Sequence, residues 1–340
     1  MREVLYFLLA TLAWPIVAGA QSFEDKDWQV VCDNTRTCRA AGYQRDGDAN
    51  AVSVLFTRAT GPNAFVTGEL QLGDMGQGGP TPPGLKLIIA GKPAGTIALE
   101  RQHKHAQLSG GVVEALLKAL SSTAPVAFSS GKTTWRLSGD GATSVLLKMD
   151  DLQGRVGTAS AITRKGTLGS DNVLLPVATP TVQAVRIAGA SQPGDDALAD
   201  RIISRIQHAD DCPALDDTDT AKDPANAPKV WHLDANRVLL RAACWRTGNN
   251  SSDGYWVAIV RPPYDAKRMT AFGRDFDGVA TLSAQHKDRD LGDCVADETW
   301  TWNGYGFELT SSATGGLCRK VSVGGAWKLP TLVTQVIPAK

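Results

Sequence analysis

Neither sign of charge is in excess in this chain of 340 residues, because lysine plus arginine and aspartate plus glutamate each number 35. The chain therefore lacks the cationic field that gathers phosphate backbones, which excludes a general nucleic-acid binder. Aromatic residues are few, at 6%, although 43% of all residues are hydrophobic. This composition is typical of a globular protein and excludes the disordered and collagen-like classes. The length fits two domains of roughly 100–200 residues each.

Long apolar runs are absent after the N-terminus, so we expect no transmembrane segment in the mature chain. At the N-terminus, Arg2 precedes an apolar run from Val4 to Val17, and Ala18-Gly19-Ala20 supplies small residues. This pattern predicts a cleaved secretory signal peptide over residues 1–20. A membrane anchor is disfavoured because the run is short of ~20 apolar residues and Pro15 interrupts it. We expect a periplasmic or secreted protein.

Cysteine pairs with the short spacing of zinc sites are also absent. In an exported chain an even number of cysteines indicates disulfide bonds, although six cysteines allow many connectivities. We expect sequential pairing, because each bond then lies within one proposed domain. The expected bonds are Cys32–Cys38, Cys212–Cys244 and Cys294–Cys318.

A stretch rich in proline, glycine and alanine divides the chain. We expect a β-rich N-terminal domain with one or two helices over 21–175, a linker over 176–194 and a C-terminal domain over 195–340. Of the 20 acidic residues after residue 190, 18 are aspartate. Aspartate favours turns, so the second half should consist of short strands joined by turns. Its net charge of −3 favours a basic partner.

Alternating apolar residues predict strands in both halves. The expected strands are 28–32, 52–56, 84–89, 237–245, 255–261, 279–284, 298–302 and 306–309. Because consecutive strands lack long helical crossovers, we expect antiparallel meanders. The fold class is therefore mainly β with a few helices (α+β), built as two antiparallel domains of the sandwich or meander type.

Helical spacing of apolar residues occurs at Val112–Leu120 and, after Asp195-Asp196, at Leu198–Ile206. The glycines around Asp140 predict a β-hairpin between Trp135–Ser138 and Thr143–Leu147. A further helix is expected over Asp150–Ile162, although Gly154 and Gly157 weaken it.

Three stretches carry a resemblance to a known family. They are residues 23–43, with Asp27-Trp28-Gln29-Val30-Val31-Cys32, residues 149–158, with Met149-Asp150-Asp151-Leu152-Gln153-Gly154-Arg155, and residues 292–319, with Trp300-Thr301-Trp302-Asn303-Gly304. Together they resemble an exported proteobacterial family labelled domain of unknown function 1176. The layout of the first half is also similar to that of the invasion-associated locus B family. The resemblance implies a periplasmic β-rich protein and supplies no catalytic residue.

An enzymatic interpretation depends on three short motifs. Ser129-Ser130-Gly131-Lys132, Ser170-Asp171-Asn172 and Arg246-Thr247-Gly248 follow the order found in penicillin-recognising enzymes. In those enzymes the serine opens a helix, whereas Lys132 runs into β-forming residues. A periplasmic serine acyl-transfer hydrolase using Ser129 and Lys132 is therefore the alternative function rather than the favoured one.

Metal sites are weakly indicated. His103 and His105 share a strand face but lack an evident third ligand, and a solvated loop is the favoured interpretation. The segments Asn249–Gly254 and Asp216–Asp219 offer oxygens without the spacing of a calcium loop. We expect no metal and no cofactor.

The favoured function is non-catalytic binding of an envelope protein or a glycan, with a structural envelope factor as a further alternative. The best candidate surface combines Trp300, Trp302, Tyr305 and Arg319, where aromatic anchors would lie within a polar rim. Buried packing of these tryptophans is the favoured interpretation, and the surface is the candidate site if the protein binds a partner there. A second candidate is the small disulfide loop with Asp33, Arg36 and Arg39. The favoured interpretation is that this loop only pins the first strand, with a local ion pair between Asp33 and Arg36.

Overall fold

The N-terminal half begins with a six-stranded antiparallel sheet. The computed structural model describes residues 21–75, 81–100, 104–189, 191–206, 212–217, 219–220, 223–247 and 250–340, so the expected signal peptide at 1–20 lies outside the described residues. In spatial order the strands are β1 (Gln21–Asp25), β2 (Trp28–Cys32), β3 (Cys38–Tyr43), β4 (Val52–Arg58), β5 (Thr67–Leu72) and β8 (His105–Gln107).

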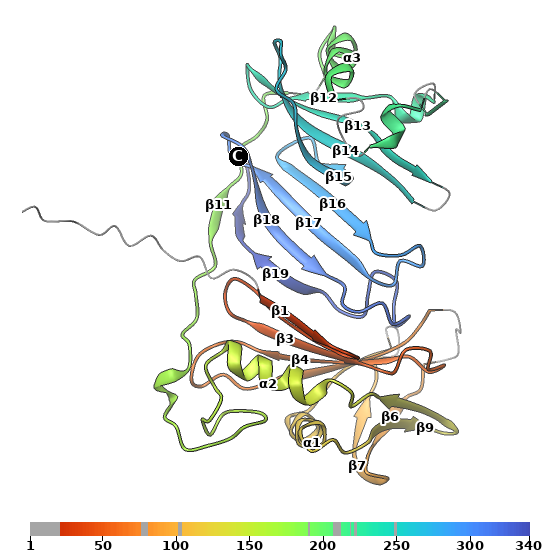
Figure 1. Cartoon of the computed structure of the whole chain (residues 1–340), viewed down its shortest axis with the longest axis vertical. Helices are drawn as coiled ribbons and strands as arrows, with labels where there is room; N and C mark the ends of the chain where they lie inside the picture. The colour runs from red at the N-terminus through yellow and green to blue at the C-terminus, as the bar shows by residue number, and fades with distance from the viewer. Residues whose placement is uncertain are drawn as a thin grey trace, which may run out of the picture.

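A four-stranded sheet and two helices complete this half (Figure 1). The sheet has the order β10 (Thr133–Leu137), β9 (Val126–Ser130), β6 (Gly84–Ile89) and β7 (Lys92–Ala98), and the helices are α1 (Gly110–Ser121) and α2 (Ala142–Leu152). One apolar cluster joins both sheets and both helices, including Trp28, Leu87, Leu116 and Leu146. Helix α1 confirms the predicted helical spacing, since Val112, Val113, Leu116 and Leu120 are all buried.

The predicted hairpin around Asp140 is wrong, because its second arm is α2. Val145, Leu146 and Met149 are buried in the apolar cluster at helical spacing, so packing selects the helix. Gly141 precedes this helix in the left-handed region, at φ +89°. The helix expected over Asp150–Ile162 is also wrong. Helix α2 starts earlier, at Ala142, and it ends at Leu152, before Gly154 and Gly157, which adopt the left-handed conformation.

The second half is built on an eight-stranded antiparallel meander in which each strand pairs with the next along the chain. The strands are β12 (Lys229–His232), β13 (Arg237–Thr247), β14 (Asn250–Ile259), β15 (Lys267–Phe276), β16 (Thr281–Lys287), β17 (Val295–Trp302), β18 (Phe307–Thr314) and β19 (Leu329–Val333). Helix α3 (Asp195–Ile206) packs on this sheet through Leu198 and Ile202.

Strand alternation gives this sheet a core on each face. Leu240 and Trp256 pack with α3, while their chain neighbours Leu239 and Tyr255 pack with the cluster that contains Trp302. Successive side chains of a strand point to opposite faces, so β13 and β14 each contribute to both clusters.

A separate apolar cluster joins the two halves. Val31, Tyr43 and Leu55 from the first sheet pack with Trp327 and Leu329 from the end of the chain. The Trp327 indole Nε1 donates to Ser53 Oγ at 2.6 Å, which ties the same two regions by a buried hydrogen bond. Strands β2 to β4 are thus covered on both faces, and the halves share a packed interface.

The segment predicted as a linker, 176–194, runs along one side of the molecule (Figure 1). Within it, β11 (Thr181–Gln183) pairs in parallel with β20 (Gln335–Ile337), and Val182 and Ile187 are buried. The segment therefore packs against the second half, while the division of the chain into two domains stays a prediction.

The fold class predicted from the sequence is confirmed: the protein is mainly β, with antiparallel sheets and few helices. The disulfide bonds are Cys32–Cys38, Cys212–Cys244 and Cys294–Cys318, each within one half. Among the described residues, no helix is both long enough and apolar enough to cross a membrane.

Candidate functional site

The tryptophans of the candidate aromatic surface are core residues. Trp302 is 1% exposed and Trp300 is 9% exposed, and both belong to the cluster with Tyr255 and Leu282. They do share one strand face, as the alternation predicts, but that face is the one that the sheet buries. The predicted aromatic surface is therefore wrong.

The other members of that surface do not form a joint site. Tyr305 is 88% exposed at the β17–β18 turn. Arg319 donates to Asp27 Oδ1 at 3.0 Å and to the carbonyl of Lys26, so it joins the two halves of the chain. The surface predicted around Cys294–Cys318 thus supplies packing and interface contacts.

The small disulfide loop is bonded mainly to its own chain. Asp33 pairs with Arg39 at 2.8 Å, and its other carboxylate oxygen accepts hydrogen bonds from Thr35 and Thr37. Arg36 donates to the backbone carbonyl of Leu175 at 3.0 Å, and the ion pair expected between Arg36 and Asp33 does not form among the described residues. These contacts favour the structural role of the loop over a role in binding.

The motifs of the serine-hydrolase interpretation do not come together. Ser129 lies in β9 and Lys132 in the turn to β10, so no helix places the lysine one turn from the serine. Ser170–Asn172 forms a short 3-10 helix of the first half, whereas Arg246 lies in β13 of the second. Gly248 lies outside the described residues. The geometry that acyl transfer requires is missing from these residues.

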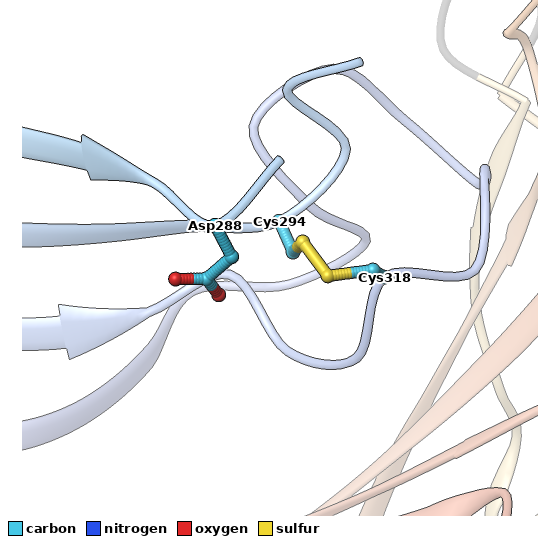
Figure 2. Close-up of side chains that lie close together, drawn as sticks. All are labelled: Asp288, Cys294 and Cys318. Carbon is cyan, nitrogen blue, oxygen red and sulfur yellow. A yellow bond between two sulfur atoms is a disulfide. The ribbon is translucent and has the colours of Figure 1, made fainter. Parts of the chain in front are cut away.

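One group of potential metal ligands exists in the described part of the chain: Asp288, Cys294 and Cys318 (Figure 2). The two sulfurs are bonded to each other, so neither is the thiolate that a metal requires. His103 lies outside the described residues. His105 is half-buried in β8 rather than in a solvated loop, and it contacts Glu69 at 3.0 Å and Glu100 at 3.4 Å.

Carboxylate oxygens that could have bound calcium are bonded to other groups of the protein. Asp217 accepts a hydrogen bond from the backbone N–H of Asp219 at 3.0 Å, which is an ordinary turn contact. Asp253 is bound by two arginines, which occupy the carboxylate that calcium would need.

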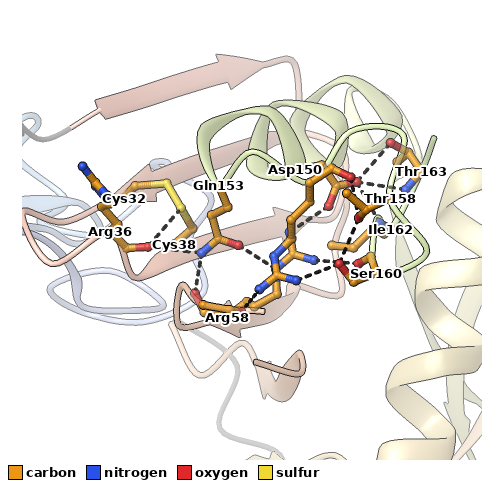
Figure 3. A network of polar contacts seen from close by, with 12 residues as sticks. Cys32, Arg36, Cys38, Arg58, Asp150, Gln153, Thr158, Ser160, Ile162 and Thr163 are labelled. Carbon is orange, nitrogen blue, oxygen red and sulfur yellow. Dashed lines mark hydrogen bonds and ion pairs between the residues drawn. A yellow bond between two sulfur atoms is a disulfide. The ribbon is translucent and has the colours of Figure 1, made fainter. Parts of the chain in front are cut away.

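A buried charge network connects β4 to the end of α2 (Figure 3). The Arg58 guanidinium donates to Asp150 Oδ1 at 2.7 Å and to Gln153 Oε1 at 2.7 Å. Arg155 donates to Ser160 Oγ at 2.8 Å and to the carbonyl of Gly61. Burial lowers the pKa of Arg58, and burial together with the Arg58 charge lowers the pKa of Arg155 to about 10. Arg58 thus pairs directly with the buried Asp150, and the charge of Asp150 also acts on the buried Arg155.

The strongest candidate site is a cleft of about 830 Å³ over strands β13 to β16. Strands β15 and β16 pair at only three positions, and this ladder ends at Gly273 and Ala284. The cleft lies at that end, since Phe272, Gln285 and Lys287 belong to its lining. We call it the basic cleft, because its lining includes Arg241, Arg246, Arg274 and Lys287 against one carboxylate, Asp253.

Asp253 fixes two of these cations. Arg246 donates to Asp253 Oδ1 at 2.6 Å, and its other nitrogens donate to Asn226 Oδ1 and to two backbone carbonyls. Arg241 Nε donates to Asp253 Oδ2, while its two terminal nitrogens have no hydrogen-bond partner among the described residues. Arg274 and Lys287 are exposed at the cleft. The cleft therefore keeps a net positive charge suited to an anion.

The sequence pattern does not reveal this site, although two of its members belong to sequence motifs. Arg246 lies in the hydrolase-like motif and Asp253 in one of the segments that resemble a calcium loop. The net charge of the second half led to the expectation of a basic partner. The cleft itself is positively charged, which favours an acidic partner at this site. The sequence signal for part of it is the presence of two arginines, Arg241 and Arg246, in one predicted strand region.

Comparison with known proteins places the chain in a family. Residues 22–334 match the family described as "Protein of unknown function (DUF1176)". The chain belongs to this family. It is 22% identical over 357 residues to "Uncharacterized protein YpfG" of Escherichia coli (strain K12), with 97% of this chain and 98% of that protein covered. No solved structure matches the chain. The family predicted from the three motif stretches is confirmed, whereas the similarity to the invasion-associated locus B family stays a prediction.

The three stretches that resembled the DUF1176 family contact one another. Arg319 from the third stretch bonds Asp27 from the first, at 3.0 Å. Gln153 from the second donates to the carbonyl of Arg36 in the first, at 3.1 Å. These DUF1176 stretches hold the fold together, and the basic cleft lies outside them.

The third stretch also contains a carboxylate whose ionisation supports the fold. Burial by itself raises the pKa of Asp293, but hydrogen bonds from Arg289 and the Lys320 backbone N–H outweigh it, so the pKa lies below its usual value. The resulting stabilisation is complete above the unfolded-state pKa of ~3.9 and is lost as the pH falls toward the lower folded-state pKa.

We therefore expect the melting temperature to fall less between pH values of about 6 and about 3 in Asp293→Asn than in the wild type. Thermal unfolding of both proteins at the two pH values measures this difference. An equal fall in both would show that Asp293 does not contribute to the acid sensitivity.

Proposed function

We propose that this protein is a non-catalytic binding protein of the cell envelope that recognises an anionic ligand in the basic cleft. The observation that carries the proposal is the local excess of cations: four arginine or lysine side chains line the cleft against one carboxylate. The volume of about 830 Å³ also lies within the range of small-ligand sites, roughly 300–1,000 Å³.

The envelope location is supported by two features. Three disulfide bonds suit an oxidising compartment outside the cytosol. The pattern of residues 1–20 is that of a secretory signal peptide. In this proposal the chain forms two domains, over 21–175 and 195–340, which dock through the cluster around Trp327.

Charge reversal in the cleft tests the function. Calorimetry with three anionic probes, hexaglutamate, hexagalacturonate and inorganic phosphate, should detect binding of at least one to the mature protein. We expect Arg274→Glu combined with Lys287→Glu to weaken that binding by about tenfold or more, because attraction becomes repulsion. The wild-type affinity should also fall when the salt concentration rises from about 0.01 M to about 0.15 M.

Arg261→Glu is the matched control. Arg261 is exposed and lies just after β14 ends at Ile259, whereas Asp253 and the cleft lie near its other end. The control should bind like the wild type. Absence of binding by all three probes, or equal binding by the cleft variant, would refute the function.

A further inference from the structure

The basic cleft offers hydrogen-bond acceptors as well as cations. Gln285 Nε2 donates to Asp297 Oδ1 at 2.8 Å, which leaves the amide oxygen of Gln285 as an acceptor. Ser252 Oγ donates to the carbonyl of Ala271 at 2.8 Å, so its lone pairs can accept. Ionised carboxylates only accept hydrogen bonds, whereas a hydroxyl group both donates and accepts. This lining therefore suits a ligand with hydroxyls beside its anionic groups.

Aromatic rings line the same space. The Phe272 and His286 rings lie 4.3 Å apart and are tilted by 37° across the end of the β15–β16 ladder. Trp245 lines the cleft from β13. Such rings bury large apolar surfaces and offer flat faces to a ligand. A sugar ring has an apolar face of C–H groups that can pack on them.

A peptide bound by strand addition is the alternative that the probes below distinguish. That mode needs an open sheet edge. The β15–β16 ladder stops at Gly273 and Ala284, so β15 before Gly273 and β16 after Ala284 do not pair with each other beside the cleft. The acceptors and the aromatic rings of the lining favour a saccharide over such a peptide.

We infer that the ligand of the basic cleft is an acidic saccharide chain, whose ring faces pack on Phe272 and Trp245 and whose carboxylates bind Arg241, Arg274 and Lys287. This inference rests on the proposed function and adds the class of ligand to it. The terminal nitrogens of Arg241 form the fork that binds a carboxylate through two hydrogen bonds.

Competing probes of similar charge test the inference on the mature protein. Hexagalacturonate should bind about tenfold or more tightly than hexaglutamate, and neutral maltohexaose should bind more weakly than either. Phe272→Leu should weaken hexagalacturonate binding about tenfold while changing hexaglutamate binding little, because leucine keeps the apolar volume without the flat ring face. Melting temperatures of the variant and the wild type verify that both are folded.

The control variant is Phe65→Leu, since Phe65 is 78% exposed in the N-terminal half; it should leave all three affinities unchanged. Equal binding of hexaglutamate and hexagalacturonate, or no effect of Phe272→Leu, would overturn the saccharide inference while leaving an anion-binding cleft. If none of the anionic probes binds, the proposed function fails together with this inference.

Discussion

Replacement of Asp150 by alanine should destabilise the protein by about 3–5 kcal/mol, since breaking a buried ion pair leaves an uncompensated buried charge. Asp150 is fully buried. One of its carboxylate oxygens accepts a hydrogen bond from Arg58 at 2.7 Å, and the other accepts one from the Ile162 backbone N–H at 2.7 Å. Without it, the buried guanidinium groups of Arg58 and Arg155 would face each other unneutralised. Urea denaturation at neutral pH measures the loss as a lower midpoint of unfolding.

The neighbouring residue provides a matched control. Asp151 is exposed and pairs with Lys148 at 2.7 Å, so Asp151→Ala should change the free energy of unfolding by about 0–1 kcal/mol. A double variant tests the cause. Asp150→Leu with Arg58→Met should be more stable than Asp150→Leu alone, because one of the unneutralised charges is removed. Similar stabilities of Asp150→Ala and Asp151→Ala would contradict the role of the network.

Hydrogen bonds also connect this network to the interface between the halves. Gln153 connects Arg58 to the Cys32–Cys38 loop by accepting from Arg58 and donating to the carbonyl of Arg36. In the same loop, Asn34 exchanges two hydrogen bonds with the backbone of Val333, at 3.0 and 2.8 Å. We therefore attribute to the loop a structural role, in which it joins α2 to the last strand of the eight-stranded sheet.

Much of the fold could be predicted because its signals are local. The spacing of Val112, Leu116 and Leu120 predicts α1, and α1 buries those residues. The wrong prediction of a hairpin between Trp135 and Leu147 has a physical cause. The glycines around Asp140 suit either a hairpin turn or the start of a helix, and the apolar cluster that selects the helix includes distant residues such as Trp28.

The basic cleft could not be predicted in this way. Its members meet through strand register, since Asp253 pairs with Gly273 and Gly273 with Ala284. A shift of register by one residue would turn these side chains to the other face of the sheet. The register depends on bulges in β13, β14 and β15, which the amino-acid pattern does not reveal. The net charge of the second half led to the expectation of a basic partner for a similar reason. It sums over the whole half, whereas the cleft contains only some of the charged side chains.

Trp302→Ala should cost about 3–5 kcal/mol of stability, the range for truncating a large aromatic side chain in a core. Trp302 is 1% exposed, and its ring centroid lies 5.4 Å from that of Phe307. The Arg237 guanidinium lies 4.7 Å from the centre of the Trp302 ring, which adds a cation–π contact. Truncation would remove these contacts and leave a cavity among Leu282 and its neighbours.

Tyr305→Ala serves as the control three residues further along the chain. Tyr305 is 88% exposed, so its removal should change the free energy of unfolding by less than about 0.5 kcal/mol. Urea denaturation of the two variants beside the wild type measures both effects. A Trp302→Ala variant as stable as Tyr305→Ala would mean that the ring is not part of the core, and the surface predicted around Trp300 and Trp302 would have to be reconsidered. A large loss confined to Trp302→Ala would identify this tryptophan as a packing residue and leave the basic cleft as the candidate site in this half.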